Sequence, residues 1–314
     1  MKKHTLCLAG LLIVALLASS CSKREGVIYK KNKIDNIFAV ENRYFDNQLF
    51  NSIENYLEED WHWDGDELYR IDYRSDHPYS ENFFYGSHRR LERTTVPAYD
   101  IRSEFFYDGR QLDHIDIFRN DNPYMTLNLL HDDDRLYEID CLYHQTTADT
   151  ASVALLPHTC PLAFLLGRQM AAQLEADNRT RLRDMQMRGA KSNTIRYLLT
   201  WSDDNVTAID CIDDNGTRRI ALTYDDKINP YRQLFGYREL TDPLFGFEML
   251  SENNITSIRM PYLFNQNQLF TYRYEYEDDC PSKRTLTYSY PAVNNTFDSV
   301  MFKYEKIETF QYLQ

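Results

Sequence analysis

Carboxylates are the side chains whose spacing in this sequence could support chemistry, because one recurs at a fixed place in a repeated pattern. The four aspartates of this row are Asp72, Asp116, Asp140 and Asp210. Each lies between two apolar residues of an expected β-strand, so all four are expected on one exposed face of a sheet. Such a row can bind cations or basic partners, or it can keep a broad sheet soluble, and the second use is the more common one.

Acidic pairs and triplets form a second group, and they fall where turns are expected. They are Asp132-Asp133-Asp134, Asp203-Asp204, Asp213-Asp214, Asp225-Asp226 and Asp278-Asp279. Calcium prefers several oxygens that converge from one loop, and the EF-hand spacing is absent. Since aspartate by itself suits tight turns, turn formation is the preferred explanation and we predict no metal site.

Recognised catalytic motifs are absent from the sequence. It contains no HExxH motif, no histidine pair combined with CxxC, no GxSxG motif, no P-loop and no GxGxxG motif. Carboxylates are abundant, but abundance does not identify a glycosidase pair. Trp61, Trp63 and Trp201 could stack on sugars, although their alternation favours packing in a core. We therefore predict no catalytic residue and no cofactor.

The elements that position these side chains come from a repeated motif, clearest at residues 105–117. It has an aromatic pair, an aspartate anchor, a polar turn, an apolar residue four places after the anchor and an isoleucine seven places after it. The anchors are Asp46, Asp64, Asp108, Asp132, Ser202, Ser251 and Glu277, with a divergent copy at Asp225. Apolar residues alternate before each turn, and alternation continues after it in Tyr69-Ile71-Tyr73 and Tyr137-Ile139-Cys141. Each copy therefore reads as an antiparallel hairpin with one face on a core.

These hairpins predict an all-β fold, a large antiparallel meander of about sixteen strands that is curled or barrel-like. An open, twisted sheet of more than about ten strands curls or splits. Residues 149–192 interrupt the repeats, and an amphipathic helical insertion is expected over about 161–187. We expect this helix to pack on the sheet, with a plug or lid over a cavity as the alternative. A membrane barrel would turn its apolar residues to lipid, and we favour it less.

Two segments carry a family resemblance, Phe106-Tyr107-Asp108-Gly109-Arg110-Gln111-Leu112 and Leu222-Thr223-Tyr224-Asp225-Asp226-Lys227-Ile228-Asn229-Pro230. They resemble the YD-type repeats of uncharacterised Bacteroidetes lipoproteins, a group of domains of unknown function. The similarity spans roughly residues 40–290. It implies a β-meander or porin-like fold and an envelope location, and it supplies no catalytic residues.

The N-terminal segment is typical of a bacterial lipoprotein. Lys2 and Lys3 precede an apolar stretch, and Leu17-Ala18-Ser19-Ser20-Cys21 resembles a lipobox. We expect a signal peptide over 1–20, lipidation at Cys21, a flexible tether over 21–36 and a β-repeat domain over 37–314. Ser22 is not the aspartate that retains lipoproteins in the inner membrane, so the outer membrane is favoured and the leaflet stays open.

The net charge of −13 becomes −15 when Lys2 and Lys3 are removed with the signal peptide. An acidic chain of this kind repels nucleic acid, so the expected partners are the membrane, through the lipid anchor, and a protein or glycan.

Four cysteines remain after Cys21. Cys141 and Cys211 hold equivalent repeat positions, two strands apart, which is nearly 10 Å and beyond disulfide reach. We expect both to be buried thiols. Cys160 and Cys280 are each followed by proline in a loop, and they are the preferred pair if a disulfide exists.

Three functions from different classes are compatible with these features. The preferred one is a non-catalytic envelope lipoprotein that acts as a binding or scaffold module for a protein or glycan. The alternatives are a carrier of an apolar ligand between the curled sheet and the helix, and a hydrolase without a recognisable motif.

Overall fold

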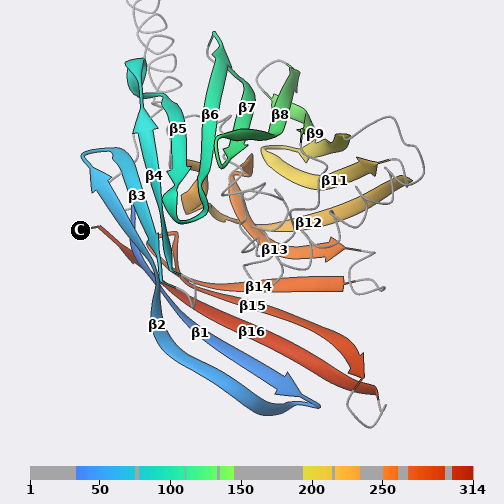
Figure 1. The fold of residues 1–314 in the computed structure, drawn as a ribbon. Helices are drawn as coiled ribbons and strands as arrows, with labels where there is room; N and C mark the ends of the chain where they lie inside the picture. Colours follow the sequence, from blue (N-terminus) through green and yellow to red (C-terminus); the bar gives the residue numbers. More distant parts are fainter. Residues whose placement is uncertain are drawn as a thin grey trace, which may run out of the picture.

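A computed structural model describes residues 33–74, 78–109, 111–132, 135–144, 194–213, 216–233, 250–260, 268–293 and 299–313. Over these residues sixteen antiparallel strands close into one barrel (Figure 1). Each strand pairs with its neighbours in sequence, and the first strand pairs with the last. The predicted all-β meander is confirmed, and the curled sheet takes its barrel form.

The strands are β1 (Ile34–Phe45), β2 (Gln48–Asp64), β3 (Glu67–Tyr73), β4 (Tyr79–Tyr85), β5 (Leu91–Val96), β6 (Ile101–Asp108), β7 (Gln111–Arg119), β8 (Asn122–Asp132), β9 (Arg135–Tyr143), β10 (Thr194–Ser202), β11 (Asn205–Asp213), β12 (Gly216–Ile228), β13 (Asn253–Met260), β14 (Gln268–Glu277), β15 (Cys280–Val293) and β16 (Ser299–Tyr312). Short 3-10 turns are η2 (Ser87–Arg89), η3 (Pro97–Tyr99) and η5 (Pro230–Gln233). No helix in this described part of the chain is long and apolar enough to span a membrane.

The predicted segment boundaries can be compared with the structure only where residues are described. The helical insertion expected over 161–187 lies outside them, as do the signal peptide and most of the tether. The first strand begins at Ile34, three residues before the expected domain start at 37. Ile34 belongs to the barrel because its side chain is fully buried and its carbonyl oxygen accepts a 2.8 Å hydrogen bond from Trp63 Nε1.

The apolar faces of the strands line the inside of the barrel. The ring of Tyr231, in η5 after β12, lies 6.4 Å from the ring of Trp61 on β2 and 6.5 Å from that of Phe310 on β16. In the wall, β13, β14, β15, β16 and β1 separate β12 from β2. These rings can therefore meet only across the interior, where the buried apolar side chains form one cluster.

The outer faces of the strands are largely polar. On β6 and β10, for example, Arg102, Glu104 and Arg196 alternate with the buried residues Ser103 and Tyr197. Outward positions on other strands include His62, Ser80, Asn82, Asp116, Thr126, Asn128, Asp140, Asp210, Arg219, Thr223, Thr271, Arg273, Lys283, Thr285 and Thr287. This distribution suits an outer surface in water.

The spacing within the repeat is explained by a β-bulge. Leu68 and Ile71, four and seven places after the Asp64 anchor, are both fully buried. Residues three apart would point to opposite faces of a regular strand. Trp63 lies opposite Leu68, but the next ladder pair skips Tyr69, so this tyrosine is an extra residue that shifts the phase.

The bulge corrects one expectation about the inner face. Tyr69 and Tyr137 were expected to alternate inward with the isoleucines that follow them. They are instead 46% and 37% exposed, because both occupy the bulge position. The extra residues of the other clear copies are Asp113 and Thr207.

Aromatic side chains connect the strands where the backbone ladders stop. Tyr107 Oη donates to Leu91 O, and Trp201 Nε1 donates to Leu136 O, both at 2.8 Å. Each donor lies three residues beyond the last ladder pair on its strand, and each acceptor two residues beyond it on the neighbouring strand. We call such a hydrogen bond a rim bridge. The others run from Trp63 to Ile34, Tyr85 to Leu68, Tyr224 to Val206, Tyr274 to Ile255 and Tyr312 to Pro281.

Turn residues adopt the left-handed backbone that tight hairpins require. Asp278 and Asp279 both have positive φ, and so does Asp203. Turn formation is therefore confirmed as the structural use of these aspartates. Asp225 and Asp226 differ, because they lie within β12, where Asp225 Oδ1 accepts a 3.1 Å hydrogen bond from Asn254 N.

Candidate functional site

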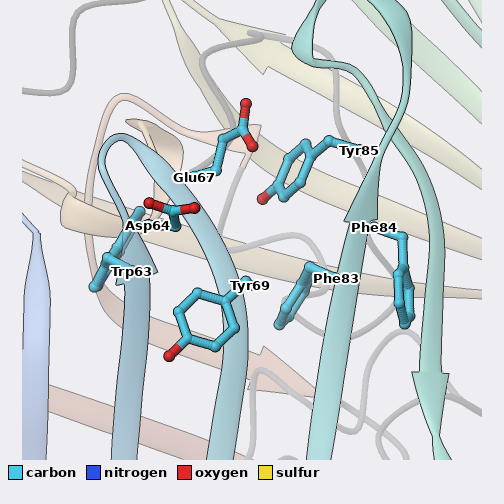
Figure 2. A pocket seen from close by; sticks show the side chains of 7 residues that line it. All are labelled: Trp63, Asp64, Glu67, Tyr69, Phe83, Phe84 and Tyr85. Carbon is cyan, nitrogen blue, oxygen red and sulfur yellow. The ribbon is translucent and has the colours of Figure 1, made fainter.

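A pocket of about 600 Å³ opens in the barrel wall between β3 and β4 (Figure 2). The ladder between these strands ends at Arg70 and Asn82. Beyond that pair, the ends of the β2–β3 and β4–β5 hairpins are no longer joined by backbone hydrogen bonds. The rim bridge from Tyr85 Oη to Leu68 O, at 2.8 Å, spans the gap. The two hairpins thus form the two sides of an open cleft.

Aromatic side chains and carboxylates line this pocket together. The lining residues are Trp63, Asp64, Glu67, Tyr69, Phe83, Phe84 and Tyr85. Figure 2 shows Tyr69 of β3 and Phe83 of β4 on either side of the gap. Phe83 is buried, whereas Phe84 and Tyr69 are exposed. Within the described residues, the Asp64 carboxylate and the Tyr69 hydroxyl make no hydrogen bond, so both are available to a ligand.

Two cations of the chain already engage the groups around the turn of this pocket. Lys33 Nζ lies 2.6 Å from Asp66 Oδ1 and 5.4 Å from the centre of the Trp63 ring. Arg89 Nε donates to Glu67 Oε1 at 2.8 Å, and this hydrogen bond raises the pKa of Arg89. The groups that would attract a cationic ligand are therefore largely satisfied from within.

A third cation covers the outer aromatic ring. The guanidinium of Arg93 lies 4.3 Å from the centre of the Phe84 ring. The three basic residues at this pocket are matched by three acidic ones, Asp64, Asp66 and Glu67. The formal charges of these six residues therefore cancel.

Asp72, the first member of the aspartate row, contacts this pocket indirectly, through His62. The ring of His62 lies 6.0 Å from that of Tyr69, and His62 Nε2 donates to Asp72 Oδ2 at 3.0 Å. Asp72 Oδ1 also accepts from Arg70 Nε at 2.7 Å and from Ser80 Oγ at 2.5 Å. Asp72 is only 6% exposed, so it is not on a fully exposed face as expected.

The ionisation of Asp72 follows from these contacts. Burial would raise the pKa of its carboxyl group, but hydrogen bonds from Ser80, Arg70 and His62 outweigh burial and lower the pKa. The carboxylate therefore stays charged and holds His62 in place behind Tyr69.

Asp60, His62 and Asp72 offer ligand atoms close enough to hold a metal ion together. Arginines already satisfy their charge, since Arg74 Nη2 lies 3.4 Å from Asp60 Oδ2 and Arg70 Nε lies 2.7 Å from Asp72 Oδ1. A divalent cation would have to bind beside two guanidinium groups. The arrangement fits a hydrogen-bonded support better than a metal centre.

The other members of the aspartate row are half-buried and paired across strands. Thr126 Oγ1 donates to Asp116 at 2.6 Å, Arg196 Nε donates to Asp140 at 3.0 Å, and Arg219 Nη1 lies 3.5 Å from Asp210. Each partner lies directly opposite its aspartate on the next strand. The row occupies one outward face, as its spacing indicated. Its carboxylates mainly contact partners on the neighbouring strands. Binding of a partner by this row stays a prediction.

The expected cysteine positions can be placed only in part. Cys141 and Cys211 are buried on β9 and β11, with β10 between them, which confirms their predicted burial and separation. Cys280 is buried at the start of β15. Its predicted partner Cys160 and the predicted lipidation site Cys21 lie outside the described residues, so both assignments stay predictions.

The pocket was not predicted from the sequence. Tyr69 was placed in the core by its alternation, and residues 83–85 lie between the copies of the repeat anchored at Asp64 and Asp108. A usable signal was present, because Tyr69 and Tyr137 bring an aromatic ring to the position that holds Asp113 and Thr207 in other copies. This signal predicts an exposed ring only when the position of the β-bulge is known.

Comparison with known proteins finds similarity among solved structures alone. No family model matches the chain, and no curated protein matches it. Among solved structures it is similar to a porin-like protein from Bacteroides vulgatus, with 8% identity, a TM-score of 0.33, and coverage of 89% of this chain and 98% of the other. At this TM-score the similarity supports no conclusion about this chain. The barrel form implied by the repeat resemblance is observed, whereas membership of a YD-type family is not shown.

Proposed function

We propose that this chain is a non-catalytic binding lipoprotein of the bacterial envelope, held at the outer membrane by an acyl group on Cys21. Its binding site would be the pocket between β3 and β4. The observation that carries the proposal is the orientation of the wall, with apolar residues inside and polar residues outside. In the described strands, large exposed apolar residues such as Leu142 and Leu269 stand among polar ones and form no continuous lipid-facing band, so the barrel needs a separate anchor to stay at a membrane.

The pocket supports binding rather than catalysis. Glu67 is held by Arg89, and the Asp64 carboxylate lies at the exposed turn of the β2–β3 hairpin. Acid–base hydrolysis of a glycoside requires one carboxylic acid that keeps its proton, usually by desolvation. Neither carboxylate has such surroundings. The aromatic rings around them provide contact area instead.

Metabolic labelling with palmitate tests the anchor. Wild type should incorporate label and fractionate with the outer membrane, and Cys21→Ala should incorporate none. Cys7→Ala is the matched control, because Cys7 lies in the predicted signal peptide and its loss should leave labelling intact.

Fractionation tests the role of the strands. A chain in which a cleavable secretory leader precedes Ser22 should be recovered in the soluble periplasm. Retention of that chain in the membrane pellet after alkaline carbonate extraction would show that the strands themselves hold it there, and the proposal would be wrong.

A further inference from the structure

We propose that the pocket between β3 and β4 binds a neutral saccharide, an inference that rests on the proposed role of this pocket as the binding site. A sugar ring presents C–H groups on its faces and hydroxyl groups around its edge. Recognition therefore needs an aromatic surface beside hydrogen-bond acceptors. The pocket places both kinds of group on one opening in the wall.

The stacking surface is provided by Tyr69. This residue is 46% exposed, although an aromatic residue in phase with Ile71 would otherwise pack inward. The bulge in β3 turns this residue outward, which is a recurrent way of re-aiming a side chain in a sheet. His62 lies behind the ring and is itself held by Asp72, so the orientation of Tyr69 is supported before a ligand arrives.

The hydrogen-bonding groups lie on the same hairpin. Within the described residues, the Asp64 carboxylate and the Tyr69 hydroxyl have no hydrogen-bond partner. A carboxylate accepts hydrogen bonds from vicinal hydroxyl groups, and the phenol can both donate and accept. The hydroxyl of Tyr85 already donates to Leu68 O in a rim bridge, so Tyr85 contributes only its ring to the pocket lining.

The charges decide in favour of a neutral ligand. Carboxylates with aromatic rings could also bind an ammonium group, as an aromatic cage does. Here Lys33 already lies at the Trp63 ring, Arg93 at the Phe84 ring, and Arg89 on Glu67. A cationic ligand would enter beside three cations, and an anionic one beside three carboxylates. A ligand with hydroxyl groups and no net charge meets neither repulsion.

Calorimetric titration of the full lipidated chain in mild detergent tests this inference. The probes are the hexasaccharides of glucose in α-1,4 and β-1,4 linkage, of mannose and of N-acetylglucosamine, with deacetylated chitohexaose as the cationic probe and hexagalacturonate as the anionic one. At least one neutral hexasaccharide should bind, and neither charged probe should bind more tightly. Tyr69→Ala should weaken that binding about tenfold or more, because the stacking surface is lost.

Tyr137→Ala is the matched control, since Tyr137 occupies the same bulge position on β9 and is also exposed. It should leave saccharide affinity unchanged. Asp64→Asn should weaken binding severalfold, and none of the three variants should lower the unfolding temperature markedly. Absence of binding by all neutral hexasaccharides, preference for a charged probe, or equal losses in Tyr69→Ala and Tyr137→Ala would each overturn the inference. None of these outcomes bears on the anchor, which the palmitate and fractionation experiments test separately.

Discussion

His131 is the residue at which the ring of rim bridges is interrupted. It lies three residues beyond Asn128, the last residue of β8 that pairs with β7, and Leu112 lies two residues beyond His114, the partner of Asn128. In seven other strand pairs of the described barrel, a tyrosine or tryptophan at the equivalent position donates a hydrogen bond to the neighbouring carbonyl. The Nε2 atom of His131 is instead buried without a hydrogen-bond partner. A buried polar atom of this kind reduces stability.

Replacing His131 with tyrosine should complete the ring. The longer side chain can reach the carbonyl of Leu112, so His131→Tyr should raise the free energy of unfolding by about 1 kcal/mol. Burial, partly opposed by Asp113, also lowers the pKa of His131 from its ordinary 6.5. The wild type therefore loses stability as the pH falls below about 6.5, where the unfolded histidine gains its proton first. Urea unfolding at pH 7.5 and 5.5 should show a smaller pH effect in the variant.

Tyr107→Phe provides the reciprocal test. This change removes only the hydroxyl that donates to Leu91 O at 2.8 Å, and it should lower the free energy of unfolding by about 1 kcal/mol. If Tyr107→Phe is neutral, the rim bridges do not stabilise the barrel, and a gain in His131→Tyr would need another cause.

The barrel is closed by a buried charge cluster on its inner face. Lys306 on β16 lies 2.6 Å from Glu58 Oε1 on β2 and 3.0 Å from Glu308 Oε1. Arg284 on β15 holds the other oxygen of Glu308 at 2.5 Å. The Lys306–Glu58 contact crosses over β1, so it ties the last strand to the second one and supports the β1–β16 seam.

Lys306→Met should therefore destabilise the barrel strongly. Glu58 and Glu308 would be left buried beside each other without their shared cation, and breaking a buried pair in this way costs about 3–5 kcal/mol. Lys283→Met is the control, because Lys283 pairs with Glu275 on the exposed face and should change stability by less than about 1 kcal/mol. Similar midpoints of urea unfolding for the two variants would show that the cluster does not support closure.

The same cluster predicts how stability responds to acid. Burial would raise the pKa of Glu308, but Arg284 and Lys306 outweigh it and lower the pKa from 4.5 to about 2. The stabilisation by ionised Glu308 is therefore complete above pH 4.5 and is lost as the pH falls towards 2. Glu308→Gln should be less stable than wild type at pH 7, and the difference in unfolding free energy should shrink between pH 4.5 and 2. A difference that stays constant over this range would mean that Glu308 does not titrate as argued.

Within one hairpin, the sequence was sufficient to predict which residues are buried in the core, but not which residues line the pocket. Leu68 and Ile71 were singled out by their distances from the anchor, and both are buried. The odd spacing between them already required a bulge, because two residues three apart cannot face the same side of a regular strand. A regular strand would place Tyr69 in the core. The bulge instead turns Tyr69 outward, where its ring lines the pocket.

Local patterns in the sequence predicted the number of strands but not the closure of the barrel. Hairpin spacing depends on turn residues and alternation within about two dozen residues, which a single sequence displays. Closure depends on the register between Ile34–Phe45 and Ser299–Tyr312, at opposite ends of the domain. No local pattern encodes that register, since Glu41 opposite Lys306 becomes meaningful only after the strands are paired. A curled open sheet and a closed barrel were therefore equivalent predictions until the pairing of the first and last strands was known.

The polarity of the wall makes a prediction about the whole barrel in solution. Outward positions carry residues such as Arg102, Thr126 and Arg219, while the apolar cluster faces inward. A chain that begins at Ser22 should therefore fold in buffer without detergent. Its circular dichroism spectrum should be dominated by β-structure, its thermal unfolding should be cooperative, and added dodecyl maltoside micelles should change neither. A membrane-spanning barrel behaves in the opposite way, since its lipid-facing band aggregates in water. If the chain precipitates in buffer and gains its β-spectrum only when micelles are added, the strands face lipid and the assignment of a water-exposed wall is wrong.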